Sequence, residues 1–131
     1  MTITNEQWQE IEKKLKNTLF ARVTFKYKNN EINVVNTLVG DRLKKVVYIN
    51  NEIKGAWDDE EHPMHQITKE VWFTKGEYLY TREFRNRFKG RMLDEDLNRK
   101  ISVYSPIFGS IKTLIRQYKK LKGLELIQIG V

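Results

Sequence analysis

One stretch of the sequence combines the residue types that bind divalent metal ions. Residues 58–65 read Asp-Asp-Glu-Glu-His-Pro-Met-His and contain both histidines of the chain. Carboxylates and imidazoles are ligands for Zn²⁺ and Mn²⁺, so a metal-dependent nuclease is one hypothesis. Consecutive acidic residues cannot all converge on one ion, however, and Pro63 interrupts the helix that would place His62 and His65 on one face. The preferred interpretation is a solvated loop whose charge offsets nearby lysines and arginines.

A second acidic cluster, Asp94-Glu95-Asp96, could contribute two carboxylates to a nuclease site. Such a site needs further ligands, and usually a lysine or a water-orienting residue at the end of a strand. The cluster is interpreted more simply as a turn between a helix and the next strand. We therefore predict no catalytic residue, no metal and no cofactor.

Basic side chains carry the stronger functional signal, and they form two groups. The members of the first group are opposed only by Glu83 and have aromatic residues between them; they are Arg82, Arg85, Arg87, Lys89 and Arg91. Arginine binds phosphate with its planar fork and stacks on bases, so this pattern fits a surface for RNA or single-stranded nucleic acid. The alternative is an amphipathic helix whose phenylalanines are core and whose arginines are merely solvated.

The second group lies near the C-terminus, with the spacing of one helix face. Its members are Lys112, Arg116, Lys119 and Lys120, and no acidic residue occurs between Ile111 and Leu124. An unpaired basic stripe on a helix predicts contact with phosphates or with acidic side chains. An ordinary solvated helix face is the alternative.

Composition limits the function classes further. The chain has 131 residues, which fits a single domain spanning residues 1–131. It has no cysteine, which excludes disulfides and thiol chemistry and is consistent with a reducing compartment. With 24 Lys and Arg against 17 Asp and Glu, the net charge of +7 favours nucleic acid or acidic protein partners, although it also promotes solubility. Apolar runs are too short for a signal peptide or a membrane span.

These side chains must be positioned by a fold, and the first half of the chain predicts an antiparallel β-meander. Alternating apolar residues, interrupted by Asn29-Asn30, Gly40-Asp41 and Asn50-Asn51, indicate strands joined by tight turns. The four predicted strands span residues 19–27, 31–39, 43–49 and 52–57. The apolar run 46–49 predicts that the third strand is an inner one, covered on both faces.

Helices are predicted on either side of this meander. Thr4 and Gln7 form a capping box, with Ile3 and Trp8 as a hydrophobic staple, so the first helix should start at Asn5. The second half should contain a short helix from residue 67, an extended piece 77–80, a helix capped by Thr81, a strand 99–104, a helix 107–121 and a closing strand 124–129.

Together these patterns predict an α+β domain. It should have an N-terminal helix, a meander of about four strands with one or two C-terminal strands added, and two or three helices in the second half.

Three stretches also resemble a family of small uncharacterised proteins encoded by phages and prophages. They are Thr2-Ile3-Thr4-Asn5-Glu6-Gln7-Trp8 through Ile11-Glu12, Val47-Tyr48-Ile49-Asn50-Asn51 through Lys54-Gly55 and Trp57, and Tyr104-Ser105-Pro106 with Ser110-Ile111-Lys112 and Leu114. They extend over nearly the whole chain. The family has no established activity or site residues, so the resemblance implies only a phage accessory protein that acts inside a bacterium.

The resulting functional hypothesis is a non-enzymatic protein that binds and inhibits a host nucleic-acid-handling or defence complex, as anti-CRISPR proteins do. Its expected partner is a host protein or ribonucleoprotein, with DNA or RNA as a possible direct contact, in the bacterial cytoplasm and without a membrane. The first alternative is a direct nucleic-acid-binding protein, and the second is the metal-dependent nuclease. The sequence leaves the oligomeric state open.

Overall fold

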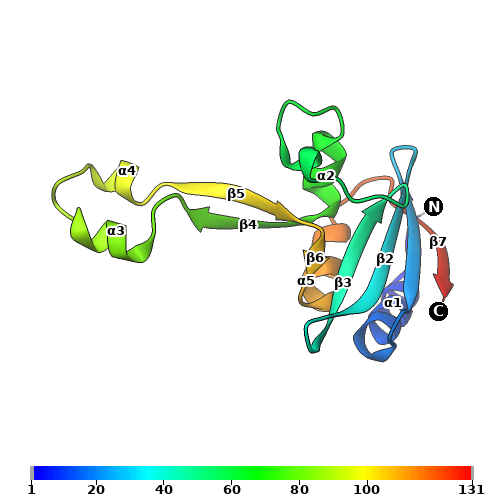
Figure 1. The fold of residues 1–131 in the computed structure, drawn as a ribbon. Coiled ribbons are helices and arrows are strands. Elements are labelled where there is room, and N and C mark those ends of the chain that lie inside the picture. The colour runs from blue at the N-terminus through cyan, green and yellow to red at the C-terminus, as the bar shows by residue number, and fades with distance from the viewer. Residues whose placement is uncertain (1, 131) are drawn as a thin grey trace.

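A long two-stranded arm projects from an α+β body (Figure 1). The computed structural model describes residues 2–130. The elements in chain order are α1 (Asn5–Asn17), β1 (Arg22–Tyr27), β2 (Asn30–Val39), β3 (Arg42–Ile49), the 3-10 helix η1 (Gly55–Asp58), α2 (His65–Val71), β4 (Phe73–Tyr78), α3 (Arg82–Arg87), α4 (Asp94–Leu97), β5 (Lys100–Ser105), β6 (Ile107–Phe108), α5 (Ile111–Tyr118) and β7 (Glu125–Gly130). The α+β class, the N-terminal helix and the meander are as predicted.

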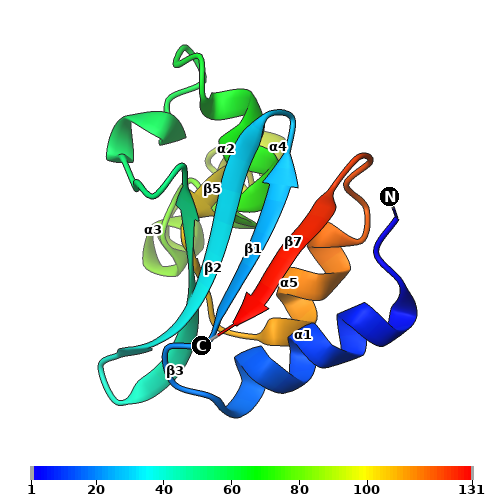
Figure 2. The same ribbon diagram turned by 90° about the vertical axis from the view of Figure 1, so that its right-hand side faces the viewer.

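The body is built on a five-stranded antiparallel sheet with the order β6-β3-β2-β1-β7. In this register Val34 of β2 lies opposite Val23 on one side and Val47 on the other. All three side chains are fully buried, so alternate residues of neighbouring strands form one continuous apolar face. Helices α1 and α5 cover that face (Figure 2).

The N-terminal helix begins where its capping residues predict. The Thr4 backbone N–H donates to Gln7 Oε1 at 2.9 Å, and the Gln7 N–H donates to Thr4 Oγ1 at 3.1 Å. Because both helix-end donors are satisfied, the helix can start at Asn5 and bury Ile11 and Leu15 against the sheet. The ring of Trp8 lies 6.1 Å from that of Phe25, which in turn makes an edge contact with Tyr118 of α5.

The predicted fourth strand, residues 52–57, is wrong. Asn50 and Asn51 adopt left-handed φ values of 52° and 65°, and only Glu52 forms a bridge, back to Ile49. The chain then enters η1, which buries Trp57 near Trp72 at 6.0 Å between ring centroids. The place beside β3 is taken by β6 instead, through the pairs Lys45–Phe108 and Val46–Ile107.

Three further boundaries differ from the sequence patterns. The first strand starts at Arg22 because Phe20 has a left-handed φ of 62°. The last helix starts at Ile111, since residues 107–108 pair with β3. The acidic residues 94–96 form the short helix α4 and not only a turn. The third strand lies between β2 and β6, so it is an inner strand as predicted. It is not fully covered on both faces: Val46 and Val47 are buried on opposite faces, but Lys44 and Tyr48, on the same face as Val46, are only half-buried.

No helix within residues 2–130 has the length and apolar character needed to cross a membrane.

Candidate binding surfaces

The arm is the feature that presents the first basic group to solvent. Strands β4 and β5 pair from Phe73–Ser105 at the body to Tyr78–Lys100 at the far end. Only the residues next to the body are partly buried, and both strands are exposed towards the tip. Six residues of antiparallel strand extend roughly 20 Å, so the segment beyond them stands well clear of the body (Figure 1).

Both strands of the arm are fixed to the body by hydrogen bonds at their base. On the β4 side, Gln117 Nε2 donates to the Trp72 carbonyl at 2.6 Å, and the Tyr118 hydroxyl donates to the Val71 carbonyl at 2.6 Å. On the β5 side, the Val47 N–H donates to the Pro106 carbonyl at 2.8 Å. The body therefore sets the direction in which the arm leaves it.

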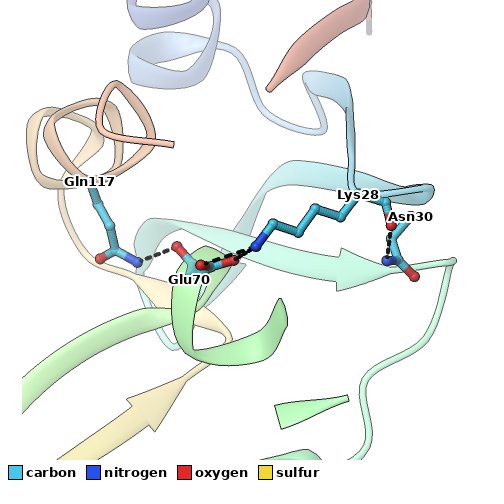
Figure 3. A network of polar contacts seen from close by, with 4 residues as sticks. All are labelled: Lys28, Asn30, Glu70 and Gln117. Carbon is cyan, nitrogen blue, oxygen red and sulfur yellow. Dashed lines mark hydrogen bonds and ion pairs between the residues drawn. The ribbon is translucent and has the colours of Figure 1, made fainter. Parts of the chain in front are cut away.

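A polar network reinforces the first of these attachments (Figure 3). Gln117 Nε2 also donates to the Glu70 carbonyl at 2.9 Å, and the Glu70 carboxylate pairs with Lys28 Nζ at 3.3 Å. The hydrogen bond to Glu70 raises the pKa of Lys28. The contacts connect α2, just before the arm, to the β1–β2 turn and to α5.

The arm tip, residues 79–99, is a small folded unit of its own. The Leu79 N–H donates to the Arg99 carbonyl at 2.9 Å and closes the segment at its base. Thr81 caps α3 as predicted, with its Oγ1 accepting from the Phe84 N–H at 3.1 Å. The rings of Tyr80, Phe84 and Phe88 follow one another at centroid distances of 4.6 and 4.5 Å. Leu97 of α4 is almost fully buried.

Four of the five predicted binding residues of the tip are exposed; they are Arg82, Arg87, Lys89 and Arg91. Within residues 2–130 none of them forms an ion pair. Arg85 differs, because its guanidinium carbon lies 3.6 Å from the centroid of the Tyr78 ring. Its Nε is buried and has no hydrogen-bond partner in that same range. Arg85 therefore holds α3 against the end of the arm, and the other four cations remain available to a partner.

The second basic group lies on the body. Lys112 and Arg116 are exposed on α5, and Lys119 and Lys120 follow at its C-terminal end. The opposite face of the same helix buries Leu114 and Tyr118, so the predicted amphipathic division is present. None of the four cations forms an ion pair in the described part of the chain.

The two basic groups do not form one surface. The first lies at the far end of the arm, and the second lies on a helix that covers the sheet (Figure 1). A partner that contacted both would have to extend along the arm to the body.

The histidines and acidic clusters do not converge. His62 Nδ1 accepts a hydrogen bond from the Met64 N–H at 3.0 Å. His65 is buried, with Nδ1 3.0 Å from the Trp57 carbonyl oxygen and its ring against Tyr104 at 5.1 Å. Among residues 2–130, no three His, Asp or Glu side chains are placed to hold a metal ion. His65 thus packs η1 and α2 against the base of β5.

Lys45 is a buried cation that is not among the predicted site residues. It lies on the covered face of β3, opposite Asn36 and Phe108, and no acidic side chain of residues 2–130 pairs with it. Burial lowers the pKa of its amine. A lysine at an inward position of the strand alternation, between Leu43 and Val47, was the available signal.

Comparison with known proteins gives no match: no family model, no curated protein and no solved structure is similar to this chain.

Proposed function

We propose that this chain is a non-enzymatic phage accessory protein that inserts its arm into a nucleic-acid-handling or defence complex of a bacterial host and blocks it, as anti-CRISPR proteins do. The observation that carries the proposal is the basic tip at the end of an arm whose two strands are anchored to the core. Arg82, Arg87, Lys89 and Arg91 are the proposed contact residues, in the bacterial cytoplasm.

The shape of the arm suits a partner with a groove or channel into which the arm can insert. A flat partner surface would touch only the end of the tip, whereas a groove or channel can also take in the arm behind it. Channels that hold nucleic acid expose phosphates when filled, and several exposed arginines and lysines provide charge-assisted bonds to phosphate. Acidic side chains at the rim of a protein would attract the same tip.

The chemistry of the described side chains does not favour the nuclease hypothesis. A metal-dependent nuclease needs converging carboxylates or histidines, and those of residues 2–130 do not converge. A groove of about 520 Å³ near the foot of the arm is lined by Lys44, Lys75 and the hydroxyls of Ser105, Ser110 and Thr113, without carboxylate or imidazole.

The test compares two variants of equal charge change in a pull-down from bacterial lysate, with and without nuclease treatment. One carries Arg82→Glu, Arg87→Glu and Arg91→Glu on the tip, and the other carries Lys112→Glu, Arg116→Glu and Lys120→Glu on the body. We expect a nuclease-resistant protein partner that the tip variant fails to capture, and the wild-type chain should inhibit the activity of that partner. Capture lost only in the body variant would contradict docking through the arm.

Direct binding of nucleic acid is the second candidate, and the aromatic rings of the tip favour it. Tyr80, Phe84 and Phe88 are half-buried, so part of each ring surface is exposed beside the arginines. Bases of single-stranded nucleic acid stack on such rings while cations bind the backbone. Recovery of nucleic acid alone, or of proteins that are lost after nuclease treatment, would favour this candidate over the inhibitor.

A further inference from the structure

Charge is segregated along the arm tip. Residues 81–91 contain five basic residues and one acidic residue, whereas residues 92–98 contain three acidic residues and no basic one. The first half includes α3 and the second includes α4. The hydrogen bond between Leu79 and Arg99 closes the segment, so both halves belong to one unit at the end of the arm.

Neither half is neutralised by the chain itself. The ion pairs within residues 2–130 are Lys28–Glu70, Lys54–Glu52 and Lys75–Glu77, and none involves the tip. Asp94, Glu95 and Asp96 are all exposed, as are four of the five basic residues of 81–91. Arg99, which closes the tip after α4, is also exposed. The tip therefore presents two unpaired charged surfaces of opposite sign.

We propose that the tip is a self-association surface, through which two copies of this chain pair about a two-fold axis with α3 of each copy against α4 of the other. About a two-fold axis, residue i of one copy contacts residue j of the other, and j of the first contacts i of the second. A surface whose positive and negative halves lie on either side of the axis is therefore complementary to itself. A second copy brings opposite charges to both halves at once. A polyanion pairs only with the basic residues around α3 and is repelled by the acidic residues of α4.

An apolar side chain lies where such a contact would be centred. Leu93 connects the two halves and has 73% of its surface exposed. Phe84, Phe88 and Met92 are half-buried in the same unit. Apolar residues at the centre with charged residues around them are the usual arrangement of a protein–protein contact.

The arm makes this contact accessible, and the contact would in turn stabilise the arm. The tips stand clear of the two bodies, so they can meet without a clash between the sheets (Figure 1). A two-stranded hairpin exposed on both faces is only marginally stable in water. Pairing of the tips would bury part of the unit and reduce fraying of β4 and β5.

The contact should be weak because one tip is small. Stable interfaces bury more than roughly 1,000 Å² in total, which a segment of 21 residues would barely provide. We therefore expect a dimer in equilibrium with monomer, and its dissociation constant should rise with added salt as the ion pairs are screened.

Sedimentation equilibrium of the full chain with charge-swapped tips tests the inference. A net-acidic tip carries Arg82→Glu, Arg87→Glu and Arg91→Glu, and a net-basic tip carries Glu95→Lys and Asp96→Lys. Each variant alone should be monomeric at concentrations where the wild type forms dimers, because like charges then face each other. An equal mixture of the two should form a heterodimer, which also shows that both tips are folded.

Three outcomes would overturn the inference. They are a wild-type chain that stays monomeric at every concentration reached in low salt, a dimer that both variants keep, and a mixture that does not associate although each variant is monomeric alone. These readouts use pure protein without lysate or nucleic acid, so they are independent of the proposed function. The tip can self-associate whether or not it also docks in a host complex.

Discussion

Arg85 lies over the ring of Tyr78, with its guanidinium carbon 3.6 Å from the ring centroid, and Lys100 Nζ lies 4.9 Å from the same centroid. Tyr78 is the last residue of β4, and Lys100 is its partner on β5. Two cations thus share one aromatic ring at the point where the arm becomes the tip. Arg85 therefore differs in role from the other basic residues of α3, because its contact with Tyr78 orients the tip relative to the strands.

We predict that Arg85→Gln loosens the tip. A cation–π contact contributes about 0.5–2 kcal/mol, so amide hydrogen exchange at Leu79, whose N–H closes the tip, should become about 2- to 30-fold faster. Arg87→Gln is the matched control, since Arg87 is exposed and makes no such contact, and it should leave exchange unchanged. Equal exchange in both variants would show that the stacking on Tyr78 does not hold the tip.

Local side-chain signals predicted the starts of α1 and α3 well. Thr4 with Gln7 and Thr81 with Phe84 form the capping contacts expected from their spacing, because capping involves only three or four consecutive residues. The alternation in the first half likewise gave β1, β2 and β3 with errors only at their ends. Such signals depend on the chain near each residue and can be interpreted without knowing the fold.

The arm could be predicted only in part, because its pairing is not local. The predicted strand 99–104 matches β5, whereas β4 was expected only as an extended piece at 77–80. Phe73 pairs with Ser105 across the whole tip, which no local pattern indicates. Ile107 was assigned to a helix because it fits the apolar period of α5, yet it completes the main sheet beside β3. The candidate basic residues were identifiable from composition, whereas their separation onto an arm and a body depends on these long-range pairs.

We predict that Lys45→Met stabilises the protein at neutral pH by about 1 kcal/mol. The methionine keeps most of the buried stem and removes the cost of holding an ammonium group near the core. Burial lowers the pKa of Lys45 in the folded state, so this cost is present at neutral pH and disappears as pH rises through the folded pKa towards the unfolded value. The gain over wild type should therefore shrink in alkaline urea titrations.

Lys44→Met is the control for this measurement. Lys44 is the neighbouring residue on the opposite, open face of β3, and it is only half-buried. Its replacement should change the free energy of unfolding at neutral pH little. A destabilised Lys45→Met would mean that the amine has a favourable interaction in the folded protein.

We predict that Tyr118→Phe destabilises the protein by about 1–2 kcal/mol at pH 7, because the Val71 carbonyl loses its donor at the base of the arm. Burial raises the pKa of Tyr118 well above the usual tyrosine value of about 10. The phenol therefore contributes stability that is fully present below the unfolded pKa and is lost as pH rises through the folded one. Wild-type stability should fall in this alkaline range more steeply than that of the variant.

The control for Tyr118 is Tyr48→Phe, on the open face of the sheet. It should change the stability at pH 7 much less than Tyr118→Phe does. Some slope should remain in Tyr118→Phe, since burial also raises the pKa of Tyr27. A Tyr118→Phe variant with wild-type stability would show that the hydrogen bond from Tyr118 does not stabilise the attachment of the arm.

The last prediction concerns how the acidic half of the tip affects polyanion binding. Glu95→Lys with Asp96→Lys should bind a single-stranded oligonucleotide more tightly than wild type, because α4 then no longer repels phosphate and no longer pairs with α3 of a second copy. Each new lysine that contacts a phosphate should steepen the slope of log affinity against log salt by about 0.7. Glu60→Lys with Glu61→Lys has the same change in net charge in an exposed loop of the body. If this control variant gained as much affinity and slope as the tip variant, net charge would explain the binding and the arm tip would not be its site.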